Sequence, residues 1–163
     1  MFSLPEHRNT ETDGAVYAEL AQQLRGLLEG ERDGLANAAN FSALLFHAVP
    51  NLNWAGFYFL RGQELVLGPF QGKPACVRIP LGKGVCGTAA RERRTLVVDD
   101  VHAFPGHIAC DPASRSELVV PLVAQDRLIG VWDVDSPLLH RFGERDQASM
   151  ETLVAMLAQA SDW

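Results

Sequence analysis

Three cysteines, Cys76, Cys86 and Cys110, are the residues of this 163-residue chain best suited to nucleophilic or redox chemistry. An odd and small number of cysteines is not typical of a framework of structural disulfides, so the thiols are inert buried groups, metal ligands or redox-active groups. Cys110 lies between His107 and Asp111 in a segment rich in turn-forming residues, which is a poor place for a purely apolar thiol. The sequence therefore favours a reactive role for Cys110.

Two interpretations of Cys86 are compatible with its neighbours. The small residues Gly87–Ala89 follow it and favour tight helix packing, in which a cysteine acts as a small buried apolar residue. Cys86 also falls in the first turn of a predicted helix, where the helix dipole is expected to lower the pKa of a thiol. A zinc site built from the three cysteines with His102 or His107 is disfavoured, because the sequence has no Cys-x2-Cys pair.

Asp133 and Asp135 are separated by one residue in a predicted strand and therefore point to the same face of the sheet. Trp132 and Val134 point to the opposite face, which we expect to be the core. Aspartate is disfavoured in strands, so two of them in one apolar run favour a functional role. The alternative is an ordinary amphipathic strand whose aspartates are solvated.

Glu117 begins the neighbouring strand of a predicted hairpin, and the hairpin loop decides whether it joins the aspartates. A two-residue loop without a bulge would pair Ala124 with Arg127 and place Glu117 opposite Val134, on the wrong face. A three-residue loop or a single β-bulge places Glu117 opposite Asp135. We predict one of these two arrangements, and with it a cluster of three carboxyl groups.

The predicted carboxyl cluster brings like charges together, because opposed side chains in a sheet have Cβ atoms about 5 Å apart. Such proximity raises at least one pKa, so we expect one carboxyl group to stay protonated near neutral pH. That acid could protonate a departing oxygen, while an ionised neighbour could bind an ammonium group. With an attacking and a resolving cysteine, the cluster meets the requirements for reducing a sulfoxide through a sulfenic acid and a disulfide.

Aromatic residues in the first predicted strand could line a pocket next to these groups. Trp54 and Tyr58 are four residues apart and share one face of the strand, whereas Phe57 and Phe59 lie on the other. Core packing alone also explains such a pattern. The indole N–H and the phenol O–H are polar groups that require partners when they are buried.

The order of elements predicts a single α+β domain, with an antiparallel sheet of about six strands and helices packed against it. Residues 1–14 are expected to be a flexible N-terminus and residues 15–163 to form the domain. Residues 99–116 are expected to be irregular, and a loop of that length is usually functional or disordered. The predicted helices are 15–29, 33–49, 85–93 and 143–160, and the predicted strands are 53–60, 64–70, 76–80, 95–98, 117–123 and 128–135.

Composition and charge exclude several classes of protein. The hydrophobic fraction of 47% is typical of a globular domain rather than a disordered chain. A net charge of −6 argues against binding to nucleic acid, which depends on clustered Lys and Arg. No window is long and apolar enough to suggest a membrane span, and the start lacks the apolar segment of a secretory signal, so a cytoplasmic location is expected.

These segments together closely resemble the free methionine-R-sulfoxide reductases, a family of GAF domains. The resemblance extends from about residue 15 to the C-terminus, and all three cysteines hold the spacing of the family. It is carried by Asn53–Tyr58, Gly68–Lys73, Cys76, Gly82–Ala89, Asp100–His102, Pro105–Asp111, Ser114, Ser116–Glu117, Pro121–Val123 and Asp133–Pro137.

The resemblance implies a role for each cysteine. Cys110 resembles the attacking cysteine, which becomes a sulfenic acid, and Cys76 resembles the principal resolving cysteine. Cys86 resembles the third cysteine of the family, which can pair with Cys110 in some oxidised forms. Thioredoxin, or dithiothreitol in its place, would be the external reductant, and no bound cofactor or metal is implied.

The resemblance also implies how free methionine sulfoxide is held. Glu117, Asp133 and Asp135 match the carboxylates that bind substrate and handle protons, and Trp54 and Tyr58 match the aromatic pocket. Selectivity for the R configuration at sulfur and a homodimeric assembly are implied by the resemblance alone.

One residue departs from the family pattern, and one alternative function is compatible with the same fold. Trp132 occupies a position where an aliphatic residue is expected, which suggests altered core packing rather than altered chemistry. A GAF sensor that binds a small ligand without converting it would have the same fold, because fold alone does not decide function. The pair of Cys110 and Cys76 beside three carboxyl groups favours the enzyme.

Overall fold

A six-stranded antiparallel sheet forms the centre of the computed structural model, which describes residues 11–108 and 110–163. Its strand order is β3-β2-β1-β6-β5-β4, so the α+β class and the number of strands predicted from the sequence are confirmed. The strands are β1 (Trp54–Arg61), β2 (Glu64–Gly72), β3 (Arg78–Pro80), β4 (Leu96–Val98), β5 (Ser116–Ala124) and β6 (Arg127–Ser136). The helices are α1 (Gly14–Leu28), α2 (Gly34–Ala48), α3 (Gly84–Glu92), the short 3-10 helix η1 (Val101–Ala103) and α4 (Glu144–Ala160).

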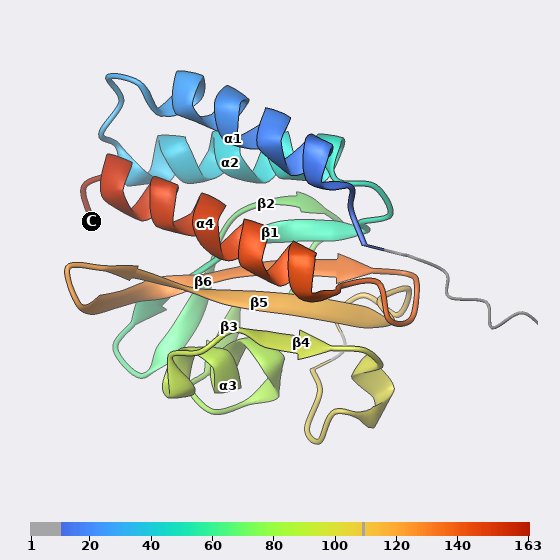
Figure 1. Cartoon of the computed structure of the whole chain (residues 1–163). Helices are drawn as coiled ribbons and strands as arrows, with labels where there is room; N and C mark the ends of the chain where they lie inside the picture. The colour runs from blue at the N-terminus through green and yellow to red at the C-terminus, as the bar shows by residue number, and fades with distance from the viewer. Residues whose placement is uncertain (1–10, 109) are drawn as a thin grey trace, which may run out of the picture.

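The helices divide into two groups around the sheet. Helices α1, α2 and α4 cover one face, while α3 and the segment between β4 and β5 lie on the other (Figure 1). Each face has its own apolar cluster, because successive residues of a strand point to opposite sides. Among the described residues, no helix is both long and apolar enough to cross a membrane.

Trp132 lies in the larger cluster, beneath the three long helices, as expected for a residue on the core face of β6. Its ring centroid is 4.8 Å from that of Phe41 and 4.9 Å from that of Phe57. The large side chain is therefore accommodated by aromatic neighbours from α2 and β1. It does not enter the opposite face of the sheet, where Asp133 and Asp135 point.

The register of the β5–β6 hairpin follows the predicted β-bulge. Glu117 is paired with Asp135, and Val119 with Asp133, so all three carboxyl groups project from one face. The loop itself has only two residues, Gln125 and Asp126.

The bulge lies close to the tip of the hairpin. Leu122 pairs with Gly130, whereas Val123 pairs with Leu128, which leaves Ile129 as the extra residue of β6. Gln125 and Asp126 both have positive φ, at 51° and 60°, as a two-residue hairpin loop requires. Without this single extra residue, Glu117 would point into the core.

Most predicted boundaries agree with the structure to within two residues. Asp33 caps α2 as expected, its side chain accepting a hydrogen bond from the Ala36 N–H. The first hairpin turn is shorter than the predicted three residues, because Arg61 pairs with Glu64. The predicted irregular segment 99–116 is mostly irregular, but it contains η1.

The segment before α1 is anchored to the domain by a buried polar network. Residues 1–10 of the predicted flexible terminus lie outside the described residues. Thr12 is 2% exposed, its N–H donates to Asp146 and its hydroxyl accepts a 2.6 Å hydrogen bond from Arg141. Thr12 is thus held against the domain, and the predicted flexibility of residues 1–14 stays a prediction. The same arginine donates to the Pro50 carbonyl, and Tyr17 donates to Asp146.

We expect Arg141→Met to lower the free energy of unfolding by about 3–5 kcal/mol, because it leaves the buried Asp146 carboxylate without its cation. The side chains of this ion pair are both 0% exposed. Urea denaturation would measure the change. Arg32→Met is the matched control, since the Arg32–Asp162 pair is 57% and 74% exposed, and its loss should cost less than about 1 kcal/mol. Equal costs for the two variants would contradict the prediction.

Candidate active site

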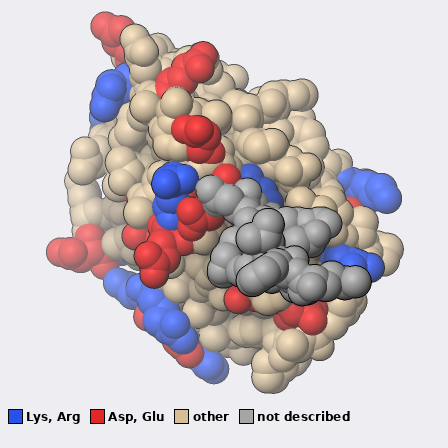
Figure 2. All heavy atoms as spheres, turned by 45° about the vertical axis from the view of Figure 1, so that its right-hand side comes forward, with Lys and Arg blue, Asp and Glu red and all other residues tan. Residues whose placement is uncertain are grey.

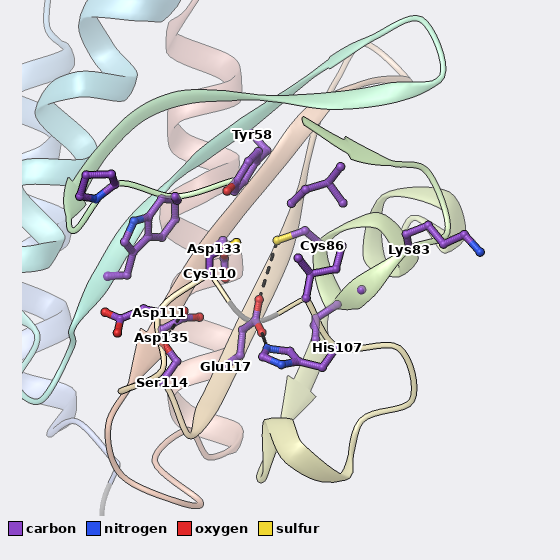
Figure 3. A pocket seen from close by; sticks show the side chains of 17 residues that line it. Tyr58, Lys83, Cys86, His107, Cys110, Asp111, Ser114, Glu117, Asp133 and Asp135 are labelled. Carbon is purple, nitrogen blue, oxygen red and sulfur yellow. Dashed lines mark hydrogen bonds and ion pairs between the residues drawn. The ribbon is translucent and has the colours of Figure 1, made fainter. Parts of the chain in front are cut away.

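A pocket opens on the sheet face opposite α1, α2 and α4, between the sheet, α3 and the segment that carries Cys110 (Figure 3). It brings together seven of the eight site residues predicted from the sequence. These are Trp54, Tyr58, Cys86, Cys110, Glu117, Asp133 and Asp135. The eighth, Cys76, lies next to the pocket and is covalently attached to Cys110, one of the residues that line it.

That attachment is a disulfide between Cys76 and Cys110. The two Cα atoms are 5.8 Å apart, within the range that a disulfide bridges. Both residues are half-buried, whereas Cys86 is buried and has a free thiol. Of the pairings left open by the residue pattern, the structure therefore contains the one between residues 76 and 110. In this form neither of those cysteines is available as a metal ligand.

The thiol of Cys86 has the opposite character to the one expected from its place in a helix. Burial raises its pKa well above the usual value, and the nearby Asp133 and Glu117 carboxyl groups raise it further. The prediction of a lowered pKa is wrong because desolvation and negative neighbours outweigh the dipole of the short helix α3. The protonated thiol donates to Glu117 Oε1 at 3.8 Å.

The three predicted carboxyl groups form a buried cluster with raised pKa values. Burial, followed by repulsion from Asp135, raises the pKa of Glu117 to about 8. Burial and the charge of Glu117 raise the pKa of Asp133 well above its usual value, and burial and Asp133 do the same for Asp135. These directions agree with the prediction that at least one carboxyl group stays protonated near neutral pH. The cluster can thus donate a proton.

A hydrogen-bond network connects this cluster to the segment that carries Cys110. Ser114 donates to Asp135 Oδ2 at 2.8 Å, and the Asn53 side-chain amide donates to Ser114 Oγ at 2.9 Å and to Asp111 Oδ2 at 3.0 Å. Asn53 precedes β1, and Asp111 follows Cys110 directly. The network therefore fixes the reactive segment against two strands of the sheet.

Sequence reasoning assigned no role in this site to Asn53, Asp111 or Ser114, and weighed His107 only as a zinc ligand. The His107 Nε2 atom lies 3.6 Å from Glu117 Oε2 (Figure 3). Burial holds the pKa of His107 below its usual value, so the ring is neutral at pH 7. Polar residues in irregular segments carry no periodic signal, so spacing alone could not place these side chains.

Trp54 and Tyr58 form an apolar wall of the pocket. Their ring centroids are 5.9 Å apart and the rings are stacked, as predicted for neighbours on one strand face. The polar atoms of both are directed elsewhere: Trp54 Nε1 donates to the Lys73 carbonyl, and Tyr58 Oη donates to the Cys76 carbonyl. The rings therefore present hydrocarbon surface to the pocket, and Tyr58 also holds the backbone of Cys76.

The N-terminus of α3 forms another wall. Lys83, the residue that caps this helix, makes no side-chain capping hydrogen bond, and the first N–H groups of a helix have no partner within it. Gly84, Val85 and Cys86 line the pocket here. The pocket thus combines carboxyl groups on the sheet with the positive end of a helix dipole, which complements a zwitterion.

Three buried oxygen atoms in or beside the pocket have no hydrogen-bond donor among the described residues. They are Asn53 Oδ1, Asp133 Oδ1 and Asp135 Oδ1. All three are acceptors, and an unpaired buried acceptor costs about 1–3 kcal/mol. A ligand that brings several N–H donors or a positive charge would satisfy them.

The pocket is small in this disulfide-bonded form, with a volume of about 30 Å³. One water needs roughly 10–15 Å³ on the same measure, so the space holds water or a single ion.

Lys and Arg side chains do not gather into a continuous patch on the face shown in Figure 2, where the described basic groups are interspersed with Asp and Glu. This distribution agrees with the net charge of −6. The described residues of this face therefore form no basic patch that would attract a polyanion over a long range.

Comparison with known proteins identifies the relatives of this chain. Residues 14–160 match the GAF domain. The free methionine-R-sulfoxide reductase of Escherichia coli (strain K12) is 52% identical over 86% of this chain and 86% of its own length. Among solved structures, the fRMsr of Staphylococcus aureus in complex with substrate is 51% identical, with a TM-score of 0.85, and covers 88% of this chain and 94% of its own. The free methionine-R-sulfoxide reductase of Neisseria meningitidis, in complex with its substrate, is 44% identical with a TM-score of 0.87 and covers 98% and 93%.

Proposed function

Because this chain belongs to the free methionine-R-sulfoxide reductase family of GAF domains, we propose that it reduces free L-methionine-(R)-S-oxide to L-methionine through a sulfenic acid on Cys110. The chain is an oxidoreductase that acts on methionine sulfoxide. The observation that carries the finer proposal is the Cys76–Cys110 disulfide beside a buried cluster of carboxyl groups, in which the pKa of Glu117 is raised to about 8.

The first half of the reaction needs a thiolate and an acid in one cavity. The Cys110 thiolate attacks the sulfoxide sulfur, and a proton from the carboxyl cluster is transferred to the oxygen. The oxygen passes to the Cys110 sulfur, which is oxidised to the sulfenic acid, and the substrate sulfur is reduced to the thioether of methionine. The raised pKa of Glu117 supports this step, since its proton is still present at neutral pH.

The second half regenerates the thiols. The Cys76 thiol condenses with the sulfenic acid of Cys110, releasing water and forming the disulfide present in the structure. An external dithiol then reduces the disulfide by exchange. We take thioredoxin as this reductant, with no bound prosthetic group, because all electrons come from thiols. Val77, next to Cys76, is 59% exposed and offers an apolar contact at the disulfide.

Substrate recognition follows from the chemistry of the walls. The unpaired acceptors of Asp133 and Asp135 suit the substrate ammonium, and the N-terminus of α3 suits its carboxylate. The stacked rings of Trp54 and Tyr58 suit the methyl group on sulfur. A peptide-bound sulfoxide lacks the ammonium group, so the same walls select the free amino acid. A cytoplasmic homodimer remains the expected form of the enzyme.

A GAF sensor that binds the same ligand without reducing it is the alternative function. Such a sensor requires the pocket but neither a resolving cysteine nor an acid. The position of Cys76 within disulfide reach of Cys110 therefore favours the reductase.

Incubation with racemic free methionine sulfoxide and thioredoxin or dithiothreitol is expected to consume the R isomer and to leave the S isomer. Chiral chromatography of the remaining sulfoxide would measure this. A parallel reaction with a peptide that contains methionine sulfoxide is expected to show no conversion. Conversion of the peptide, or binding of the free amino acid without turnover, would contradict the proposal.

A further inference from the structure

The pocket contains a second constellation, formed by groups that the disulfide leaves untouched. Donor atoms of Cys86, Glu117 and Asp133 all lie within 4.8 Å of one another, and all three residues are buried. His107 Nε2 is 3.6 Å from Glu117 Oε2, and its ring lies beside the Glu117 side chain (Figure 3).

We propose that these residues form a binding site for a divalent zinc ion, with Cys86 Sγ, Glu117, Asp133 and His107 Nε2 as ligands. One sulfur, one imidazole nitrogen and two carboxylate oxygens make a four-ligand set of the kind that zinc prefers. Magnesium and calcium prefer oxygen ligands alone and would leave the sulfur and nitrogen unused.

An unpaired buried atom supports a ligand at this position. Asp133 is 5% exposed, and its Oδ1 has no hydrogen-bond donor among the described residues. The pocket that Asp133 lines has about 30 Å³ of space, enough for an ion. A cation bound here would therefore satisfy the unpaired oxygen of Asp133.

This constellation differs from the zinc site weighed from the sequence. That site needed all three cysteines, two of which are joined in the disulfide. The new site uses Cys86 alone among the thiols, so it does not require residues 76 and 110 to be reduced. Zinc binding at this site would displace the proton of the Cys86 thiol and that of any protonated carboxyl ligand, because a thiolate and carboxylates are the ligands.

A zinc ion in this site would inhibit the reductase, an inference that rests on the proposed function. Asp133 and Glu117 would be held by the metal, so neither could bind the substrate ammonium or supply a proton. Zinc is thus expected to inhibit competitively with free methionine sulfoxide.

Cobalt titration of the oxidised protein tests the site without any turnover. With residues 76 and 110 joined, Cys86 is the remaining thiol among the chain's three cysteines. A thiolate-to-cobalt charge-transfer band that saturates at one ion per chain is expected, and Cys86→Ser should abolish it. Absence of the band in the unmodified chain would overturn the proposal.

Zinc affinity, measured by competition with a chromogenic chelator, tests the ligand set. Cys86→Ser and His107→Ala should each weaken binding by at least about tenfold. His102→Ala is the matched control, because His102 is exposed and lies outside the cluster, and it should bind zinc normally. Equal affinity in the control and in both ligand variants would overturn the site. Zinc binding in a chain without reductase activity would uphold the site and contradict the proposed function.

Discussion

A Cys110→Ser variant is expected to lose turnover of free methionine sulfoxide by at least about 10³-fold, because a serine hydroxyl is a poor nucleophile toward sulfur and cannot form a sulfenic acid. Cys110 lies in an irregular segment and is half-buried, so the substitution should not disturb the sheet. Substrate binding should persist, since the carboxyl cluster and the aromatic wall do not depend on this sulfur. Isothermal titration of the reduced variant and an assay of methionine release would separate the two effects.

Cys76→Ser is the matched variant for this experiment. It retains the attacking thiol but lacks the resolving one, so it should release one methionine per chain and then stop. The sulfenic acid left on Cys110 should react with dimedone and be visible by mass spectrometry. Wild-type turnover in Cys110→Ser would refute the assignment of the nucleophile, and multiple turnovers in Cys76→Ser with thioredoxin would refute the assignment of the resolving cysteine.

Removing one acid from the cluster should have the second largest effect. Glu117→Gln is expected to lower kcat by about 10²–10⁴-fold, the usual contribution of a positioned general acid. Because the pKa of Glu117 is about 8, the wild-type rate should fall as the pH rises above that value and the proton is lost. This alkaline decline should change position in the variant. Stopped-time assays between pH 6 and pH 10 would record both effects.

Glu64→Gln is the control, because this exposed carboxylate only pairs with Arg78 on the neighbouring strand. It should keep the wild-type pH profile. An unchanged profile in Glu117→Gln as well would assign the proton to another group.

The carboxyl group of Glu117 also makes the free energy of unfolding depend on pH. Its folded-state pKa of about 8 lies above its usual value of 4.5, so folding favours the protonated form. This contribution is fully present below pH 4.5 and is lost as the pH rises toward 8, because the unfolded chain ionises first. Urea denaturation at pH 5 and pH 8 should therefore show a shallower loss of stability for Glu117→Gln than for the wild type.

Local patterns were sufficient for much of the site. The two-residue period of a strand put Asp133 and Asp135 on one face. Counting residue pairs back from the hairpin loop showed that Glu117 joins them only if the loop has an odd length or a strand contains a bulge. The same period separated Trp54 and Tyr58 from the core aromatics. These predictions succeeded because they depend on backbone geometry, which a few neighbouring residues determine.

Other features depended on contacts between segments far apart in the chain. The pairing of residues 76 and 110 and the link from Asn53 to Ser114 both join distant segments. No spacing in the sequence encodes those distances.

The sequence by itself determined the nature of the reactive groups, their faces on the strands and the family to which the chain belongs. The tertiary structure decided their protonation and partners. Cys86 shows the difference: its helix position indicated a reactive thiolate, but burial among carboxyl groups keeps it a thiol. A pKa depends on desolvation and on charges that the fold brings together through space, and neither can be derived from the neighbouring residues in the sequence.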